Sequence, residues 1–257
     1  MNFPIIASKS KDMKIIAGLA FFLSMSSISF GQLDYAKILG DTASKPNDKK
    51  FNIALQVGAG TRTGVFLERE RENNRDFNRR LNYGFHLEFQ PTYFIKSNWG
   101  VGLVANMYCA QSTGNYEMTN DQNPDVGVRK STQTDAILFV GPALVGRYEY
   151  KKFRLQYSVA GGVQAYGSEM KWDEPSAGKS YKTQVMAATW SVGANLHIGY
   201  QVMEGLHVFL SPAYYFGLVN RAEFKAVNDE KMTRNLKGED RIDLSRFSLG
   251  LGASYSF

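Results

Sequence analysis

The sequence has little of several features that define large classes of proteins. A single cysteine, Cys109, in 257 residues excludes a disulfide framework and any cysteine-rich zinc or iron–sulfur module. Three histidines without a tight spacing give no support for a metal centre, so no cofactor is expected. Seven prolines and 24 glycines are too few, and 13% aromatic residues too many, for a disordered or collagen-like chain. A regularly folded chain is therefore expected.

Long hydrophobic runs are also scarce. A mean hydropathy of −0.30 excludes a polytopic helical membrane protein, whose spans would each need about 20 apolar residues. The one continuous apolar run is Ile15 to Leu23, with Lys9, Lys11 and Lys14 before it and small or polar residues after it. This pattern predicts a cleaved signal peptide over 1–31, followed by a polar periplasmic lead-in over 32–50. The chain is expected to be exported.

The charge is mixed in sign. The formal net charge of +6 comes from 30 basic and 24 acidic residues, and the predicted signal peptide contributes part of the excess. No basic stripe alternates with aromatic residues, as a nucleic-acid-binding surface would require. A nucleic acid partner is therefore not expected.

From Phe51 onward the apolar residues recur at every second position, which is the period of a β-strand. In the last segment, Phe247, Leu249 and Leu251 fall on one face, while Arg246, Ser248 and Gly250 fall on the other. The same alternation predicts eight strands, at about 51–67, 81–95, 99–117, 132–150, 153–170, 182–202, 206–225 and 240–257.

The lengths of these strands and of their connections indicate a barrel that spans a membrane. Strands of 15 to 20 residues greatly exceed the roughly 5–6 that are usual in soluble sheets. Short turns alternate with long polar loops, whereas a soluble β-sandwich, the alternative, would have turn signals every 8–12 residues or so. We expect an all-β fold over 51–257: an eight-stranded antiparallel up-and-down transmembrane β-barrel with an apolar exterior and a polar lumen.

Two sequence details accompany this expectation. Pro91, Pro142 and Pro212 fall within strands, and each should cause a bulge or a local irregularity, because proline cannot donate to the ladder. Aromatic residues gather near the short-turn end, where an interfacial girdle belongs. They are Tyr93, Trp99, Tyr148, Tyr150, Phe153, Tyr200, Tyr255 and Phe257.

The C-terminus resembles the terminal strand of bacterial outer-membrane barrels. The resemblance rests on a final aromatic residue and on the alternating residues before it: Leu249, Leu251, Ala253, Tyr255 and Phe257. It implies that these residues are read by the barrel-assembly machinery, and that the protein is integral to the outer membrane of a Gram-negative bacterium. With its glycine-rich strands, the segment 51–257 is similar in style to the outer-membrane β-barrel domain proteins of Bacteroidota.

The predicted lumen carries a set of polar and charged residues. An eight-stranded barrel is just filled by its own side chains, and buried charges need partners. We therefore expect a polar network inside the barrel rather than a wide pore or a catalytic centre. Its expected members are His86, Glu88, Arg147, Glu149, Arg154 and His197.

Two other functions remain open at this stage. One is a narrow channel for small or apolar solutes, which would need a lateral opening or a mobile plug. The other is a lipid-modifying barrel enzyme with its site at the rim. His86 with Glu88, or His197 with Asn195, could form a pair, but neither matches a Ser–His–acid arrangement. The expected protein is therefore not an enzyme.

The charged segment 68–80 is the most distinctive of the predicted loops. It contains the arginines Arg69, Arg71, Arg75, Arg79 and Arg80. As an ordinary feature it is a solvated hairpin tip; as a functional one, its arginines contact lipopolysaccharide phosphates or dock a protein partner. The expected function is an outer-membrane barrel that acts through its external loops in envelope structure, in adhesion, or as an accessory subunit of a membrane complex. Its expected partners are outer-membrane lipid, lipopolysaccharide and, during biogenesis, the barrel-assembly machinery.

Overall fold

The computed structural model describes residues 49–64, 74–117, 128–174, 179–225, 231–238 and 241–257. The chain divides into two units, 1–44 and 45–257, and the described residues all belong to the second. The predicted signal peptide lies outside the described residues. Within the described ranges, no helix is both long enough and apolar enough to cross a membrane.

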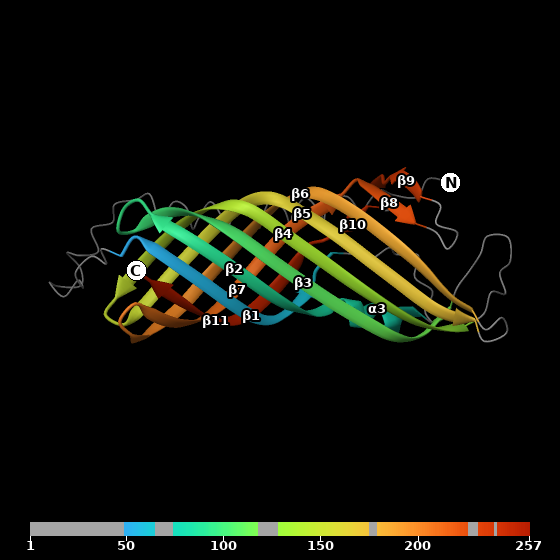
Figure 1. Cartoon of the computed structure of the whole chain (residues 1–257), viewed down its shortest axis with the longest axis horizontal. Coiled ribbons are helices and arrows are strands. Elements are labelled where there is room, and N and C mark those ends of the chain that lie inside the picture. The colour runs from blue at the N-terminus through green and yellow to red at the C-terminus, as the bar shows by residue number, and fades with distance from the viewer. Residues whose placement is uncertain (1–48, 65–73, 118–127, 175–178, 226–230, 239–240) are drawn as a thin grey trace, which may run out of the picture. The chain divides into compact units, whose positions relative to one another are not determined.

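The described part of the chain is almost entirely β-structure (Figure 1). Its strands are β1 (Phe51–Arg62), β2 (Tyr83–Phe94), β3 (Trp99–Glu117), β4 (Val128–Tyr150), β5 (Phe153–Glu174), β6 (Lys179–Met203), β7 (Leu206–Val219), β8 (Arg221–Lys225), β9 (Lys231–Asn235), β10 (Ile242–Asp243) and β11 (Arg246–Ser256). One short helix, α3 (Arg75–Leu81), precedes β2.

Eight of these strands form a closed antiparallel ring. Each of β1 to β6 pairs with the next along the chain, β7 pairs with β11, and β11 pairs with β1. At the seam, the backbone N–H of Phe257 donates to the Phe51 carbonyl at 2.9 Å, and the reverse bond measures 3.1 Å. Closure leaves the ring without an edge, so the predicted eight-stranded barrel is confirmed.

The alternation of side chains places apolar residues outside and polar residues inside. Trp190, Leu251 and Leu144 are 81%, 67% and 65% exposed on the exterior. Asn106, Asp135 and Gln164, by contrast, are each 0% exposed in the lumen. A soluble sheet has the opposite polarity, because its apolar face packs into a core. An apolar exterior around a polar lumen is the arrangement of a barrel in lipid.

The tight turns lie at one end of the ring, between β4 and β5 and between β6 and β7. Lys151 has a φ of 55° and Gly205 a φ of 79°, as such short hairpins require. Exposed aromatic residues surround this end, including Tyr148, Phe153 and Tyr200. The Phe153 and Tyr200 rings contact each other at 5.2 Å between centroids, which supports the predicted aromatic girdle.

Each of the three strand prolines coincides with a gap in one ladder. The β2–β3 pairs skip Pro91, the β4–β5 pairs skip Pro142, and the β6–β7 pairs skip Pro212. The register is the same on both sides of each gap, so these are interruptions rather than bulges. On its other side each proline stays paired, so the missing N–H costs one ladder only.

At the end opposite the short turns, β3, β4, β5 and β6 extend beyond the ring. At this end the predicted strand bounds are wrong. β1 ends at Arg62, five residues earlier than predicted, and β7 ends at Val219. β7 pairs with β11, but after Asn220 the chain no longer does. β8 pairs with β6 instead, and β9, which lies in a segment predicted as a loop, pairs with β8. Within the last predicted strand, an interruption at Leu244 and Ser245 separates β10 from β11, although both pair with β7 in one register.

The predicted loop 68–80 is partly helical. Phe77 and Leu81, four residues apart, place one apolar face of α3 against the barrel, and both are buried. Asn74, just before the helix, donates to the Glu117 carbonyl at 2.9 Å and accepts from the Glu117 N–H at 2.7 Å. These contacts dock α3 on the outer part of β3.

Candidate functional site

A buried carboxylate occupies the middle of the lumen. Glu88 on β2 accepts hydrogen bonds from Asn195 on β6 at 2.6 Å and from Asn106 on β3 at 3.1 Å. The Tyr215 hydroxyl on β7 also donates to Glu88. Arg246 on β11 lies 4.6 Å from the centroid of the Tyr215 ring and donates to Asn106 at 2.7 Å. Five strands therefore meet around one carboxylate.

A second group of polar contacts lies nearer the short-turn end. Arg154 on β5 contacts Glu149 at 2.6 Å, the Asn52 side chain at 3.3 Å and the Ser256 hydroxyl at 3.0 Å. Arg147 donates to backbone carbonyls, at 2.6 Å to Ser97, and its guanidinium lies 3.8 Å from the centroid of the Phe94 ring. Both buried guanidinium groups are thus partnered, as burial of charge requires.

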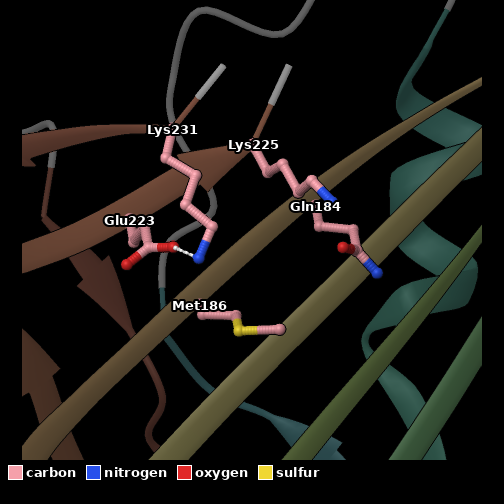
Figure 2. A pocket seen from close by; sticks show the side chains of 5 residues that line it. All are labelled: Gln184, Met186, Glu223, Lys225 and Lys231. Carbon is pink, nitrogen blue, oxygen red and sulfur yellow. Dashed lines mark ion pairs between the residues drawn. The ribbon is translucent and has the colours of Figure 1, made fainter. Parts of the chain in front are cut away.

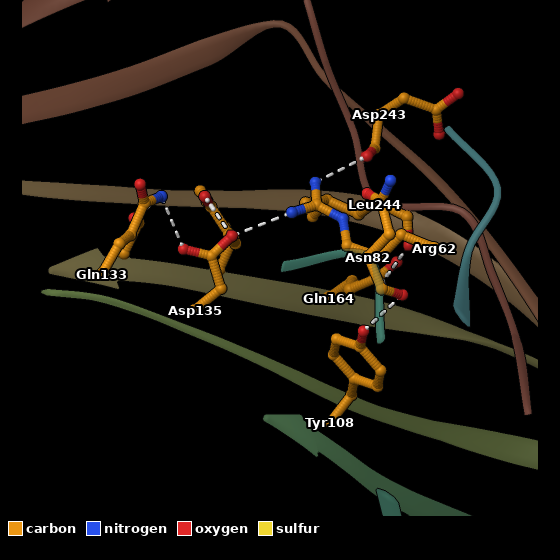
Figure 3. A network of polar contacts seen from close by, with 10 residues as sticks. Arg62, Asn82, Tyr108, Gln133, Asp135, Gln164, Asp243 and Leu244 are labelled. Carbon is orange, nitrogen blue, oxygen red and sulfur yellow. Dashed lines mark hydrogen bonds and ion pairs between the residues drawn. The ribbon is translucent and has the colours of Figure 1, made fainter. Parts of the chain in front are cut away.

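A third group of polar contacts lies nearer the long-loop end of the lumen (Figure 3). Arg62 and Asp135 form an ion pair at 2.9 Å, with both side chains at most 1% exposed. Asp135 also accepts from Gln133 at 3.0 Å and from Tyr166 at 3.2 Å. Arg62 donates in addition to the Asp243 carbonyl at 2.9 Å, which ties β1 to the end of β10.

The strand order shows that these contacts cross the barrel. In a ring of eight, β2 stands opposite β6 and β1 stands opposite β5. The Glu88–Asn195 and Arg154–Asn52 hydrogen bonds therefore join diametrically opposed strands. The Arg62–Asp135 pair joins strands three places apart. Side chains thus bridge the lumen at three levels.

Apolar layers lie among the polar groups. One contains Phe94, Val104, Phe139 and Ala213, all buried within the ring. Another lies toward the long-loop end and contains Tyr108, Ile137, Leu236 and Leu244. The buried Leu244 belongs to the interruption between β10 and β11, so this irregularity directs an apolar side chain inward.

The six lumen residues chosen from the sequence all face the interior, but they form separate groups. Glu149 and Arg154 are paired, whereas Glu88 bonds to residues other than His86. The ring of His86 packs against the backbones of β1 and β11. It fits there because residue 58 is glycine: a Cβ at that position would lie 2.7 Å from the ring. His197 stacks on Phe209 at 4.2 Å between centroids. The two histidines thus occupy packing positions.

Three central members of the network were not among the predicted lumen residues: Arg62, Asp135 and Arg246. Arg246 was placed on the polar face of its strand but was not given a partner. Asp135 lies on the same face of β4 as Arg147, so the period-two phase could have identified it. The Arg62 partnership could not be read from period alone, because residues 62 and 135 are brought together only by the order of strands in the ring.

The five predicted external arginines have different positions. Arg69 and Arg71 lie outside the described residues. Arg75, Arg79 and Arg80 belong to α3, and Arg80 donates to the Thr113 carbonyl at 2.9 Å. A shallow hollow of about 210 Å³ lies beside the first residue of β2 and is lined by Asp76, Arg79, Arg80 and Tyr83.

The predicted assembly residues form the exterior face of the last strand. Five residues of this face are 42–67% exposed: Phe247, Leu249, Leu251, Tyr255 and Phe257. Ala253 shares this face. Phe257 contacts the ring of Phe51 at 5.3 Å between centroids, so the final residue also packs across the seam. Among the described residues, no group of three or more His, Cys, Asp or Glu side chains could hold a metal ion.

Four features define the class of the protein: the closed ring of eight strands, the apolar exterior, the polar lumen and the strands that extend beyond the ring. The protein has the architecture of a transmembrane β-barrel, of the kind that outer-membrane proteins have. No protein-family model matches the sequence, and no curated protein sequence matches it either.

The chain is similar in fold to solved outer-membrane proteins. These include a major outer membrane protein from Thermus thermophilus, with 11% identity, coverage of 80% of this chain and 99% of that one, and a TM-score of 0.49. They also include the outer membrane protease OmpT from Escherichia coli, with 12% identity, 84% and 99% coverage, and a TM-score of 0.47. OprG from Pseudomonas aeruginosa has 15% identity, 83% and 99% coverage, and a TM-score of 0.43.

Proposed function

We propose that this protein is a filled, non-conducting barrel of the bacterial outer membrane that acts through its external surface. The observation that carries the proposal is the set of cross-barrel contacts at three levels, centred on Glu88–Asn195, Arg154–Asn52 and Arg62–Asp135. An eight-stranded barrel has little interior to spare, and side chains that hydrogen-bond across it leave no continuous open path.

The same contacts support a non-enzymatic role. The charged lumen groups form hydrogen bonds to other lumen side chains or to the backbone. Both lumen histidines chosen from the sequence pack against neighbouring groups of the wall. A general acid or base, by contrast, needs a side chain that can reach a substrate.

The outer part of the barrel is the proposed working surface. Strands β3 to β6 continue beyond the ring, and α3 docks there with Arg79 and Arg80 beside the exposed Tyr83. Arginine is suited to phosphate and carboxylate groups because its planar fork forms paired hydrogen bonds. We propose that these arginines, together with Arg69, Arg71 and Arg75, contact lipopolysaccharide or a protein partner in envelope structure or adhesion.

Conductance across a planar lipid bilayer tests the filled barrel. The purified wild-type protein should give no defined single-channel steps, whereas a general porin inserted under the same conditions should give them. The double variant Glu88→Ala/Asn195→Ala, which removes one cross-barrel contact, should raise the frequency of openings. Regular steps from the wild-type protein would show a conduit and overturn the proposal.

A further inference from the structure

The part of the wall that extends beyond the ring has two edges, and the described residues cover only one of them. At the β3 edge, α3 binds the backbone in place of a neighbouring strand. Asn74 donates to the Glu117 carbonyl at 2.9 Å and accepts from the Glu117 N–H at 2.7 Å, and Arg80 donates to the Thr113 carbonyl at 2.9 Å. At the other edge lies β9, whose one strand partner within the described ranges is β8.

The strand order places the open edge of β9 above the end of β1. β8 continues the path of β7 beside β6, and β9 pairs with β8 on the side where β10 and β11 pair with β7. The next position around the wall is that of β1, which ends at Arg62, and the one after it is that of β2, which α3 precedes. In the part of the chain that the structure describes, no strand stands between β9 and α3.

The backbone of β9 presents alternate hydrogen-bonding groups to this open edge. The Leu236 N–H donates to the Asn220 carbonyl, at the start of β8, at 2.8 Å. Because hydrogen-bonded and non-hydrogen-bonded pairs alternate along an antiparallel ladder, the N–H and C=O groups of Met232 and Arg234 also face β8. The groups of the other three residues face away from it: Lys231, Thr233 and Asn235. All five residues of β9 are exposed.

Charged side chains, lysine above all, often protect an unpaired edge of this kind. On β9 both cationic side chains lie back over β8 instead. The Lys231 ammonium contacts Glu223 on β8 at 3.2 Å (Figure 2). The Arg234 guanidinium lies 6.0 Å from the centroid of the Phe224 ring, which is also on β8. The backbone groups at the edge are therefore accessible to a further strand.

The side chains of β9 indicate what such a strand would carry. Met232 and Arg234 share the lumen-side face of the sheet with Phe224 and the buried Ala222, and Met232 is 48% exposed. An apolar side chain opposite Met232 and a carboxylate opposite Arg234 would form favourable cross-strand pairs. The edge thus favours a strand with an acidic and an apolar residue two positions apart.

We propose that β9 is a docking edge for a protein partner, which adds an extended acidic segment as a strand antiparallel to β9. A strand in this position runs in the direction of β1 and occupies the place above it. Its main chain pairs with Lys231, Thr233 and Asn235, and its alternate side chains provide the specificity. The inference rests on the proposed function, because it names the kind of partner that the external surface takes.

The test uses a synthetic peptide, capped at both ends, with the core Thr-Glu-Thr-Val-Thr. In an antiparallel pair its glutamate faces Arg234 when its valine faces Met232. The control peptide has lysine in place of the glutamate. Two protein variants differ at one backbone group: Thr233→Pro removes an N–H that faces the open edge, without removing a bond to β8, and Thr233→Ala keeps it. Amide hydrogen exchange, followed by NMR on the folded protein in detergent, measures binding and locates it.

In the wild-type protein alone, the amides of Thr233 and Asn235 should exchange faster than those of Met232 and Arg234. The glutamate peptide should slow exchange at Lys231, Thr233 and Asn235. Binding to Thr233→Pro should be at least about tenfold weaker, because a main-chain hydrogen bond is lost, whereas Thr233→Ala should bind like the wild type. The variant Arg234→Glu, which leaves the backbone unchanged, should reverse the preference and bind the lysine peptide more tightly.

Three results would overturn the docking edge. Slow exchange at Thr233 and Asn235 in the protein alone would show that the edge is already paired within the chain. Equal binding of the two peptides to the wild-type protein, or unchanged preference in Arg234→Glu, would remove the acidic partner.

Bilayer conductance of the same preparation separates this inference from the proposed function. A protein that gives no channel steps and binds neither peptide would refute the docking edge alone. A protein that gives regular steps and binds the glutamate peptide would refute the filled barrel alone.

Discussion

At the scale of single residues, the protein is organised by charges that are buried inside a barrel wall and matched across it. Glu88, Asp135, Arg62, Arg154 and Arg246 would each be costly in isolation, since a buried ion must be paired or hydrogen-bonded. Each has at least two polar or aromatic contacts from other strands. The pairing explains how these charges are accommodated inside the ring.

The Arg62–Asp135 pair gives a direct prediction of stability. Arg62→Met leaves the fully buried Asp135 carboxylate without its cation, which should lower the free energy of unfolding by about 3–5 kcal/mol. The double variant Arg62→Met/Asp135→Leu removes both charges and should recover most of the loss. Urea unfolding in lipid vesicles measures both values. A single variant as stable as the wild type would contradict the role assigned to the pair.

Glu169 gives a prediction of pH dependence outside the membrane-spanning part. Hydrogen bonds from Lys182, Lys171 and Gln184 lower the pKa of Glu169 from 4.5 to about 2. Because the folded-state pKa is depressed, its contribution is fully present above pH 4.5 and is lost as the pH falls toward 2. NMR titration of the Glu169 carboxyl carbon should show this low midpoint. The Lys182→Gln variant should move the midpoint upward, and a wild-type midpoint near 4.5 would contradict the contacts.

At the scale of elements, period-two patterning predicted most of the wall and failed where the wall ends. β3 has the predicted bounds of 99–117: apolar exterior residues recur at every second position from Trp99 to Cys109, and the pairing with β4 continues to Glu117. β7 and β8 were predicted as one strand, since the alternation resumes after Asn220 with only a phase change. Which strand β8 pairs with depends on the register of β6, and a local pattern does not contain that information.

The α3 helix shows the same limit and supports a prediction of its own. Arginines and acidic residues dominate the segment 68–80, so Phe77 alone does not reveal a docked helix in the sequence. In the structure Phe77 is buried and contacts Tyr116 at 5.2 Å between ring centroids. Phe77→Ala should undock α3, at a local cost of up to about 3–5 kcal/mol, while the ring stays closed.

Limited proteolysis of folded protein in detergent measures this effect. Cleavage within 75–81 should accelerate in Phe77→Ala and stay unchanged in the exposed-residue control Arg75→Ala. Equal cleavage rates in the two variants would show that Phe77 does not hold the helix.

At the scale of the whole molecule, average composition conceals the class of the protein. A mean hydropathy of −0.30 is ordinary for a water-soluble chain, yet the apolar residues occupy every second position and face outward. The polar residues of the lumen and the charged residues of the outer strands offset these apolar residues in the mean hydropathy. Strand length, the alternation of short and long connections and the terminal Phe257 together indicated the barrel. The identities of the cross-lumen partners required the strand order of the closed ring.

Closure of the ring in the outer membrane is the central claim, and gel mobility tests it most directly. Protein extracted with detergent from an outer-membrane fraction should run at one position unboiled and at another after boiling, because a closed barrel resists unfolding until it is heated. The difference in mobility should disappear when deletion of residues 247–257 removes all of β11 except Arg246, and with it nearly all of the pairing with β1. Identical mobility of the wild-type protein before and after boiling, or its recovery in the soluble fraction, would contradict the account.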